Sequence, residues 1–248
     1  MQRRAFLSVL AVLSVLLVLP AYAQKRRAVR SPAAGAPSGN CHAFGLVAAG
    51  TKASYLTTTP SGNVTFTITW ISDTPTQTKT TQQVSTPQGN ADAETVLDGE
   101  VVGNLRGLKK SLVKTTTNVP VLGKVTGEVE LTFVPSLILG PADGWCVGNT
   151  WNVSPVTETI VVRAPIGIPT TTTQTTIGGT GEVLAVGESA SVTGGTFNTV
   201  KYKSITVAND TPQPAITWVD MVRNIVVKQE TLDASGNVTS TTTLTSVQ

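Results

Sequence analysis

Short runs of alternating apolar and polar residues, separated by turn-forming residues, constrain the fold of this chain most strongly. The longest stretch of this kind spans residues 191–245, where Gly, Asn, Asp and Pro interrupt runs rich in Thr and Val. In residues 64–70, read as VTFTITW, the apolar side chains fall on one face of a strand and the threonines on the other. This alternation is typical of antiparallel strands that bury one face and wet the other.

The composition supports the same fold class. Thr and Val are β-branched and favour strands, while the aromatic fraction of 5% and the charged fraction of 13% are both low. The 22 glycines and 14 prolines are scattered as turn residues, without a repeat period. We predict an all-β protein built on a curved antiparallel sheet that forms an incomplete β-barrel. Residues 89–107 are the most ambiguous segment and allow one short helix.

The first 23 residues resemble a secretory signal peptide. Arg3 and Arg4 precede an apolar run that ends near Leu19, and an Ala-Tyr-Ala site follows, so cleavage is expected after Ala23. The run is shorter than the roughly 20 apolar residues of a membrane span. We therefore predict a secreted or periplasmic protein with no transmembrane segment once the signal peptide is removed.

Residues 24–40 are basic at first and then rich in Ala, Pro, Gly and Ser, which predicts a flexible linker. The chain has 18 basic and 15 acidic side chains; since Arg3 and Arg4 leave with the signal peptide, 16 basic and 15 acidic residues remain. A nearly neutral chain lacks the basic face that a nucleic-acid partner needs.

The only two cysteines, Cys41 and Cys146, are expected to form a disulfide, because the chain is predicted to be exported. Closing a loop of roughly a hundred residues stabilises a fold by about 4–5 kcal/mol in the chain-entropy model. The alternative, Cys41 acting as a nucleophile beside His42, is disfavoured, since adjacent residues of an extended chain point to opposite sides.

Catalytic patterns are scarce. His42 is the single histidine, so a Ser-His-Asp triad or a histidine-rich metal site would have to use it. Two Asp-Thr-Pro tripeptides, at Asp73 and Asp210, resemble the Asp-Thr-Gly pairs of aspartic proteases but are ordinary turn openers. Glu128 and Glu130 share one strand face and suit either a glycosidase pair or a solvated surface; we favour the surface. We predict a protein that is not an enzyme, with no cofactor and no metal site.

Six aromatic residues fall on apolar strand faces of the predicted sheet. They either line a cavity for a lipid or another hydrophobic small molecule, or they simply fill the core. The six residues are Phe66, Trp70, Phe133, Trp151, Phe197 and Trp218.

Several short motifs resemble those of uncharacterised bacterial exported proteins. Residues 148–151 (GNTW) are similar to a G-D-T-W motif, and residues 192–201 to a V-x-x-G-x-F-x-x-x-K motif. Residues 216–230 are similar to an ending with T-W and G-I-V-K-x-E, with Asn224 in place of Gly, and Asn also tolerates a left-handed turn. Residues 50–55 are like a G-x-x-W-x-Y opening that lacks its Trp.

Domains of these proteins resemble the LolA/LolB lipoprotein-carrier fold, a curved antiparallel sheet in the form of an incomplete barrel. The resemblance covers roughly residues 45–245. It implies an interior that binds acyl chains, but its motifs are structural rather than catalytic, and a fold does not by itself confer a function.

These patterns together predict a signal peptide (residues 1–23), a linker (24–40) and a single antiparallel β domain (41–248). The first functional hypothesis is a non-catalytic envelope protein that holds a hydrophobic ligand in a concave sheet. The alternative is a structural or adhesive β module whose Thr-rich faces contact proteins or glycans. An extracellular hydrolase is a third and weaker hypothesis, and the sequence does not predict the oligomeric state.

Overall fold

The computed structural model describes residues 41–248 except for residues 44, 87–88, 120–122, 143 and 165–168. The predicted signal peptide and the predicted linker lie outside the described residues, so both stay predictions. Strands dominate the described chain. No helix occurs among these residues, and hence none that is long and apolar enough to cross a membrane.

The structure has fourteen strands in its described part, and they pair in antiparallel fashion. In chain order they are β1 (Cys41–His42), β2 (Lys52–Thr59), β3 (Gly62–Asp73), β4 (Gln77–Thr86), β5 (Gly89–Val102), β6 (Leu105–Val119), β7 (Gly123–Pro141), β8 (Trp145–Cys146), β9 (Thr150–Arg163), β10 (Thr171–Val192), β11 (Gly195–Ala208), β12 (Thr211–Asp220), β13 (Val226–Leu232) and β14 (Val238–Val247). The all-β prediction is therefore confirmed.

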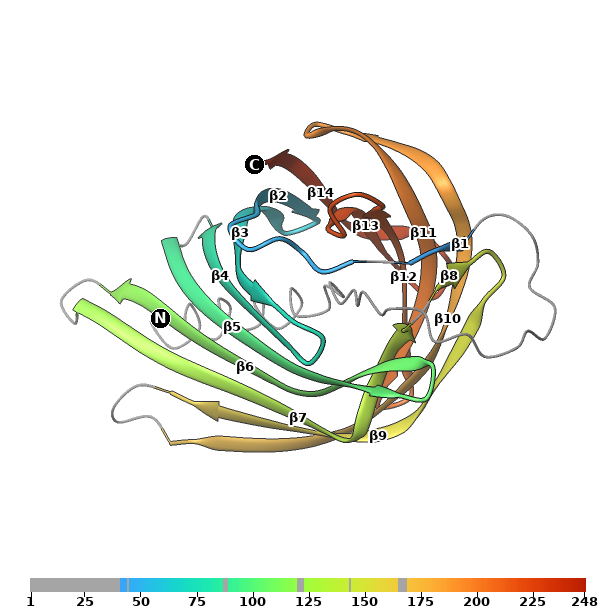
Figure 1. Ribbon diagram of the computed structural model, residues 1–248. Coiled ribbons are helices and arrows are strands. Elements are labelled where there is room, and N and C mark those ends of the chain that lie inside the picture. The colour runs from blue at the N-terminus through green and yellow to red at the C-terminus, as the bar shows by residue number, and fades with distance from the viewer. Residues whose placement is uncertain (1–40, 44, 87–88, 120–122, 143, 165–168) are drawn as a thin grey trace.

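Twelve of these strands form one closed barrel, in the order β10-β11-β12-β13-β14-β2-β3-β4-β5-β6-β7-β9 (Figure 1). The prediction of an incomplete barrel is wrong, because β14 pairs with β2 and β9 pairs with both β7 and β10. At the β14–β2 junction, Lys52 and Gln248 exchange two backbone hydrogen bonds of 3.0 and 2.9 Å. Each of the twelve barrel strands in the described part of the chain therefore has a neighbour on both sides, so none of them is a sheet edge.

The short helix allowed within residues 89–107 is also wrong, since this segment forms β5, a turn and the start of β6. The Ala, Glu and Leu residues of β5 favour a helix when taken alone. In the barrel, however, Ala91, Ala93 and Thr95 face the interior, while Asp92 and Glu94 face solvent. Burial of one face between β4 and β6 therefore overrides the local preference.

Strand β3 has the two faces that its alternation predicts. Phe66, Ile68 and Trp70 are buried, whereas Thr65 is exposed on the opposite face. Tyr55 of β2 lies opposite Phe66, and their rings stack with centroids 5.0 Å apart at an interplanar angle of 18°. Residues of β2 and β3 thus form an aromatic wall of the barrel, which we define as Tyr55, Phe66, Ile68 and Trp70.

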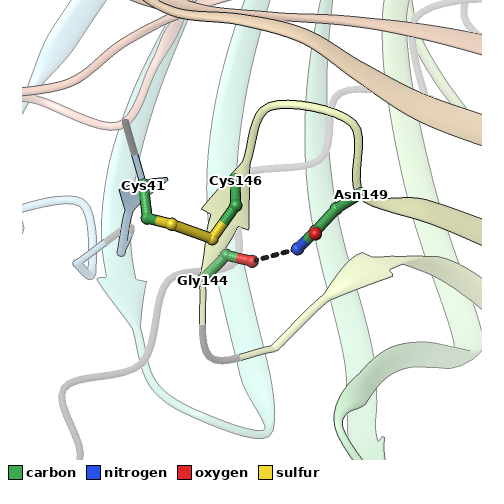
Figure 2. The surroundings of a disulfide bond; sticks show 4 residues. All are labelled: Cys41, Gly144, Cys146 and Asn149. Carbon is green, nitrogen blue, oxygen red and sulfur yellow. Dashed lines mark hydrogen bonds between the residues drawn. A yellow bond between two sulfur atoms is a disulfide. The ribbon is translucent and has the colours of Figure 1, made fainter. Parts of the chain in front are cut away.

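The connections between the strands divide the barrel into two ends. We call the end that holds the turns β2–β3, β4–β5, β6–β7, β9–β10, β11–β12 and β13–β14 the far end. The opposite end holds the disulfide between Cys41 and Cys146, which ties β1 to β8 across 105 residues, so the predicted pairing is confirmed (Figure 2). We call this second end the disulfide end.

The segment that follows β1 crosses the disulfide end and is held there by hydrogen bonds. The backbone N–H of Gly45 donates to Asn224 Oδ1 at 3.1 Å, and that of Val47 donates to Asp73 Oδ2 at 2.8 Å. Asn224 has a φ of 60°, as expected for an Asn that replaces Gly in a left-handed turn. The segment therefore joins the β12–β13 turn to the end of β3.

Candidate functional site

The structure does not bring the six predicted aromatic residues together on one surface. Phe66, Trp70, Phe197 and Trp218 belong to one core cluster. Trp151 packs with Trp145 and Tyr202 in a second cluster, and Phe133 packs with Leu108, Val156 and Ile177 in a third. The side chains of all six are only 2–8% exposed. Their placement is that of core residues distributed around the barrel.

A different part of the interior has the composition of a binding surface. The inward-facing residues of β4, β5 and β6 are mostly small, and many carry hydroxyl groups, while their neighbours along each strand face solvent. We call this set the hydroxyl wall. It comprises Thr78, Thr80, Gln82, Ala91, Ala93, Thr95, Ser111, Val113 and Thr115.

Strand register aligns these side chains in rows across the wall. Thr95 of β5 lies between Thr80 of β4 and Val113 of β6, and Ser111 of β6 lies between Leu97 of β5 and Leu131 of β7. Directly opposed residues of antiparallel strands point to the same face. Hydroxyl-bearing and apolar side chains are therefore interspersed on the interior surface, as suits a ligand that is mainly apolar.

Several hydroxyl groups on the interior have no hydrogen-bond partner. Thr95 Oγ1, Ser111 Oγ, Thr117 Oγ1 and the Tyr55 hydroxyl are buried and make no hydrogen bond to any residue that the structure describes. A buried polar group without a partner costs about 1–3 kcal/mol. Such groups in a native fold point to water or a ligand that completes them.

The interior also holds one carboxylate, on Glu158 of β9. This residue lies opposite Phe133 of β7 and Thr175 of β10, in phase with the inward-facing Val156 and Ile160. Its exposure is 8%, and it makes no hydrogen bond or ion pair with the described residues. Burial raises the pKa of the Glu158 carboxyl above its ordinary value.

Near the far end the same interior face becomes partly accessible. Val125 of β7 and Ile160 and Val162 of β9 are half-buried there, and Thr173 of β10, opposite Ile160, is exposed. At the disulfide end, by contrast, Trp145 of β8 is buried beside Trp151 and Tyr202. Among the described residues, the inward-facing side chains are therefore less buried near the far end than at the disulfide end.

The glutamates considered for glycosidase chemistry face outward and are neutralised by cations. Glu128 pairs with Arg163 and lies 3.9 Å from Lys114, while Glu130 pairs with Lys110 at 3.2 Å. The hydrogen bond from Lys110 lowers the pKa of Glu130. A catalytic acid needs a raised pKa instead, so this outward face suits a solvated surface rather than hydrolysis.

The other residues that resembled catalytic groups have structural roles. Asp73 accepts hydrogen bonds from the Val47 backbone and from the Thr78 hydroxyl, at 2.8 and 2.5 Å. Asp210 has a φ of 61° in the β11–β12 turn. Cys41 is oxidised in the disulfide and so cannot act as a thiol nucleophile.

Trp218 lies within a charged cluster that the sequence patterns did not indicate. The ammonium groups of Lys201 and Lys228 lie 5.0 and 4.9 Å from its ring centre, from the two neighbouring strands. Glu188 Oε1 accepts the indole N–H at 3.4 Å and pairs with Lys201, and Glu230 pairs with Lys228 at 2.6 Å. Every charge in this cluster has a partner, which indicates a structural role.

A surface depression of about 340 Å³ lies between β9, β10 and β11. Polar and charged residues, including the exposed Asn152 and Glu182 and the half-buried Lys203, make up much of its lining. This lining does not suit an apolar ligand, so the barrel interior remains the stronger candidate.

Glu158 and the hydroxyl wall were not singled out from the sequence, although a signal for each is present. In residues 156–162 a carboxylate stands in phase with apolar residues, where a strand with one wet face would carry its charge on the other side. Residues 78–83 (TKTTQQ) are polar at every position, so alternation did not distinguish the inward from the outward face.

No protein-family model matches this chain, and no curated protein is significantly similar to it in sequence. Among solved structures, it is similar to one described as a candidate exported protein with a YmcC-like fold from Bacteroides fragilis, at 10% identity and a TM-score of 0.43, covering 82% of this chain and 97% of the other. It is also similar to a candidate lipoprotein from Parabacteroides distasonis, at 10% identity and a TM-score of 0.34, covering 81% and 96%. Both likenesses are too distant to carry an argument about function.

The resemblance to the LolA/LolB carrier fold stays a prediction.

Proposed function

We propose that this protein is a non-catalytic barrel that works outside the cytoplasm and holds a hydrophobic molecule against the hydroxyl wall. The observation that carries the proposal is the set of buried, unpartnered hydroxyl groups on one face of the interior. The disulfide supports a location outside the cytoplasm, because such bonds persist in oxidising compartments.

The size of the barrel supports an occupied interior. Side chains fill a barrel of about eight strands, and the interior widens roughly in proportion to the strand number. Here twelve strands surround the interior, and the small side chains of Ala91, Ala93 and Ser111 on the hydroxyl wall fill little of it. A ligand with an apolar body and a few polar atoms would fill this space and complete the hydroxyl groups.

Mass spectrometry and thermal denaturation test this proposal. The exported protein should release a co-purified hydrophobic molecule on organic extraction, and added medium-chain lipids should raise its melting temperature, because a ligand that binds only the folded state stabilises it. A ligand present at 100 times its Kd stabilises the fold by about 2.7 kcal/mol.

Variants locate the binding surface. Thr95→Val combined with Ser111→Ala removes two unpartnered hydroxyls and should reduce the lipid-induced shift. Thr81→Val, on the exposed face of β4, is the matched control and should leave the shift unchanged. If no lipid co-purifies and none shifts the melting temperature, the barrel does not carry a hydrophobic ligand.

A structural or adhesive role is the second candidate, and one surface favours it. An outward strip combines the exposed Thr157 of β9 and Thr172, Gln174 and Thr176 of β10 with the half-buried Thr159, which accepts a hydrogen bond from Gln174 Nε2 at 3.3 Å. A regular row of polar side chains of this kind can contact a partner protein or glycan. Changing Thr157 and Thr159 to Lys would abolish adhesion without altering lipid binding.

A further inference from the structure

Glu158 is one of few charged residues on the interior surface around the hydroxyl wall. Arg106 of β6 is also buried, on the strand face of Leu108, and its charge acts on Asp73, which accepts a hydrogen bond from Thr78. On β10, the residues that face the same way as Glu158 are Thr173, Thr175 and Ile177. Among the described residues, none forms an ion pair or a hydrogen bond with Glu158, and burial is the cause that raises its pKa.

An uncompensated carboxylate in apolar surroundings is unfavourable. Phe133, Val156 and Ile160 are the inward-facing neighbours of Glu158, and the Thr175 hydroxyl bonds to Asn209 instead, at 3.1 Å. Burying a charge without a partner is among the most costly arrangements in a protein interior. A carboxylate at such a position is stabilised by a proton or by a cation supplied from outside the chain.

We propose that Glu158 selects the ligand by binding a cationic head group, so that the barrel holds an amphiphile with a protonated amine on an apolar body. This inference rests on the proposed function, which concerns only the apolar part of the ligand. The amine would donate hydrogen bonds to the Glu158 carboxylate, and the apolar body would lie along the interspersed hydroxyl-bearing and apolar residues of the hydroxyl wall. An anionic head group at the same position would instead be repelled by the Glu158 carboxylate.

A series of three twelve-carbon probes separates the two proposals. Dodecylamine, dodecanol and dodecanoate share the apolar chain and differ in the charge of the head group. Each is titrated below its micellar concentration, at pH 7, into the exported protein, with binding followed by calorimetry and by the shift in melting temperature. Dodecylamine should bind about tenfold more tightly than dodecanol, and dodecanoate should bind most weakly.

Glu158→Gln keeps the shape of the side chain but removes its charge. In this variant the preference for dodecylamine over dodecanol should disappear, while dodecanol binding should stay within about twofold. Glu94→Gln is the matched control, because Glu94 is exposed on the outer face of β5, and it should keep the preference. The wild-type series tests the inference even if Glu158→Gln does not fold.

The possible outcomes are distinct. Equal binding of dodecylamine and dodecanol, or a preference that survives Glu158→Gln, would overturn the role of Glu158 and leave the hydrophobic-ligand proposal standing. Tighter binding of dodecanoate would also overturn it. If none of the three probes binds, both proposals fail.

Discussion

The aromatic wall and the hydroxyl wall are neighbours on the same barrel, yet they are built for different tasks. On the aromatic wall, Tyr55 and Phe66 stack, and every member is no more than 3% exposed. On the hydroxyl wall, the residues are also buried, with at most 8% exposed, but Thr95 and Ser111 leave their polar atoms without partners. The aromatic wall carries a single unpartnered polar atom, the Tyr55 hydroxyl, on an otherwise apolar and stacked surface, whereas unpartnered hydroxyls recur on the hydroxyl wall. The contrast teaches that burial alone does not distinguish core from site; the density of buried polar atoms without partners is the more useful guide.

The largest effect is expected on the aromatic wall. Phe66→Ala removes a stacked ring from the interior and should lower the free energy of unfolding by about 3–5 kcal/mol. Denaturant unfolding followed by circular dichroism measures this loss. Thr65→Ala, on the exposed face of the same strand, is the control and should change stability by no more than about 0.5 kcal/mol. A small effect of Phe66→Ala would show that this wall is loosely packed.

A somewhat smaller loss is expected where aromatic packing meets the backbone. A Cβ at Gly181 of β10 would lie 2.0 Å from the Trp151 ring. Gly181→Ala should therefore destabilise the barrel by about 1–3 kcal/mol through overpacking, measured by the same denaturant unfolding. Gly144→Ala is the control, because a Cβ at Gly144 would meet open space and the φ of Gly144 is ordinary. Gly103→Ala is unsuitable, because Gly103 has a φ of 63° that an alanine would adopt only with strain.

Substitutions on the hydroxyl wall should behave in the opposite way. In the ligand-free protein, Thr95→Val removes an unpartnered hydroxyl at constant shape and should leave stability unchanged or raise it by up to about 1 kcal/mol. Thermal denaturation of extracted, ligand-free protein provides the measurement. A clear loss of stability would mean that the Thr95 hydroxyl already has a partner in the free barrel.

The smallest effect is a dependence of stability on pH that comes from Glu158. Burial raises the pKa of this carboxyl in the folded protein, so its favourable contribution is present below the ordinary pKa of 4.5 and is lost as the pH rises through the folded value. Asp73, whose pKa burial also raises, contributes in the same direction. The difference in melting temperature between wild type and Glu158→Gln isolates Glu158. Relative to the variant, wild type should lose stability on going from pH 4 to pH 7, and a flat difference would contradict the assignment.

The sequence predicts those features that depend on neighbouring residues. Alternation predicted the two faces of β3, and the expected export predicted the pairing of Cys41 with Cys146. Asn224, which stands where the resembled motif has Gly, takes the left-handed conformation that Asn tolerates. Each of these follows from local backbone preference or from a small number of possible partners.

Other features depend on contacts that no local pattern contains. Closure of the barrel requires β14 to pair with β2, and Leu244 lies opposite Tyr55 across almost the whole described chain. The buried position of Glu158 depends on the pairing of β9 with β7 and β10, which the local sequence does not reveal. The helix-favouring residues of β5 misled the prediction for the same reason, since strand partners outweigh local preference.

The closed topology has a consequence for how the barrel assembles. Every other pair of neighbouring strands in the ring is consecutive or separated only by the short β8, so hairpins can form in order along the chain. The seam between β14 and β2 alone joins distant segments, and such non-local pairing carries the largest entropic cost of loop closure. We expect the pairing of β14 with β2 to be the last to form during folding. A substitution that weakened it would expose two long strand edges at once, and each could recruit a second copy of the chain into an aggregate.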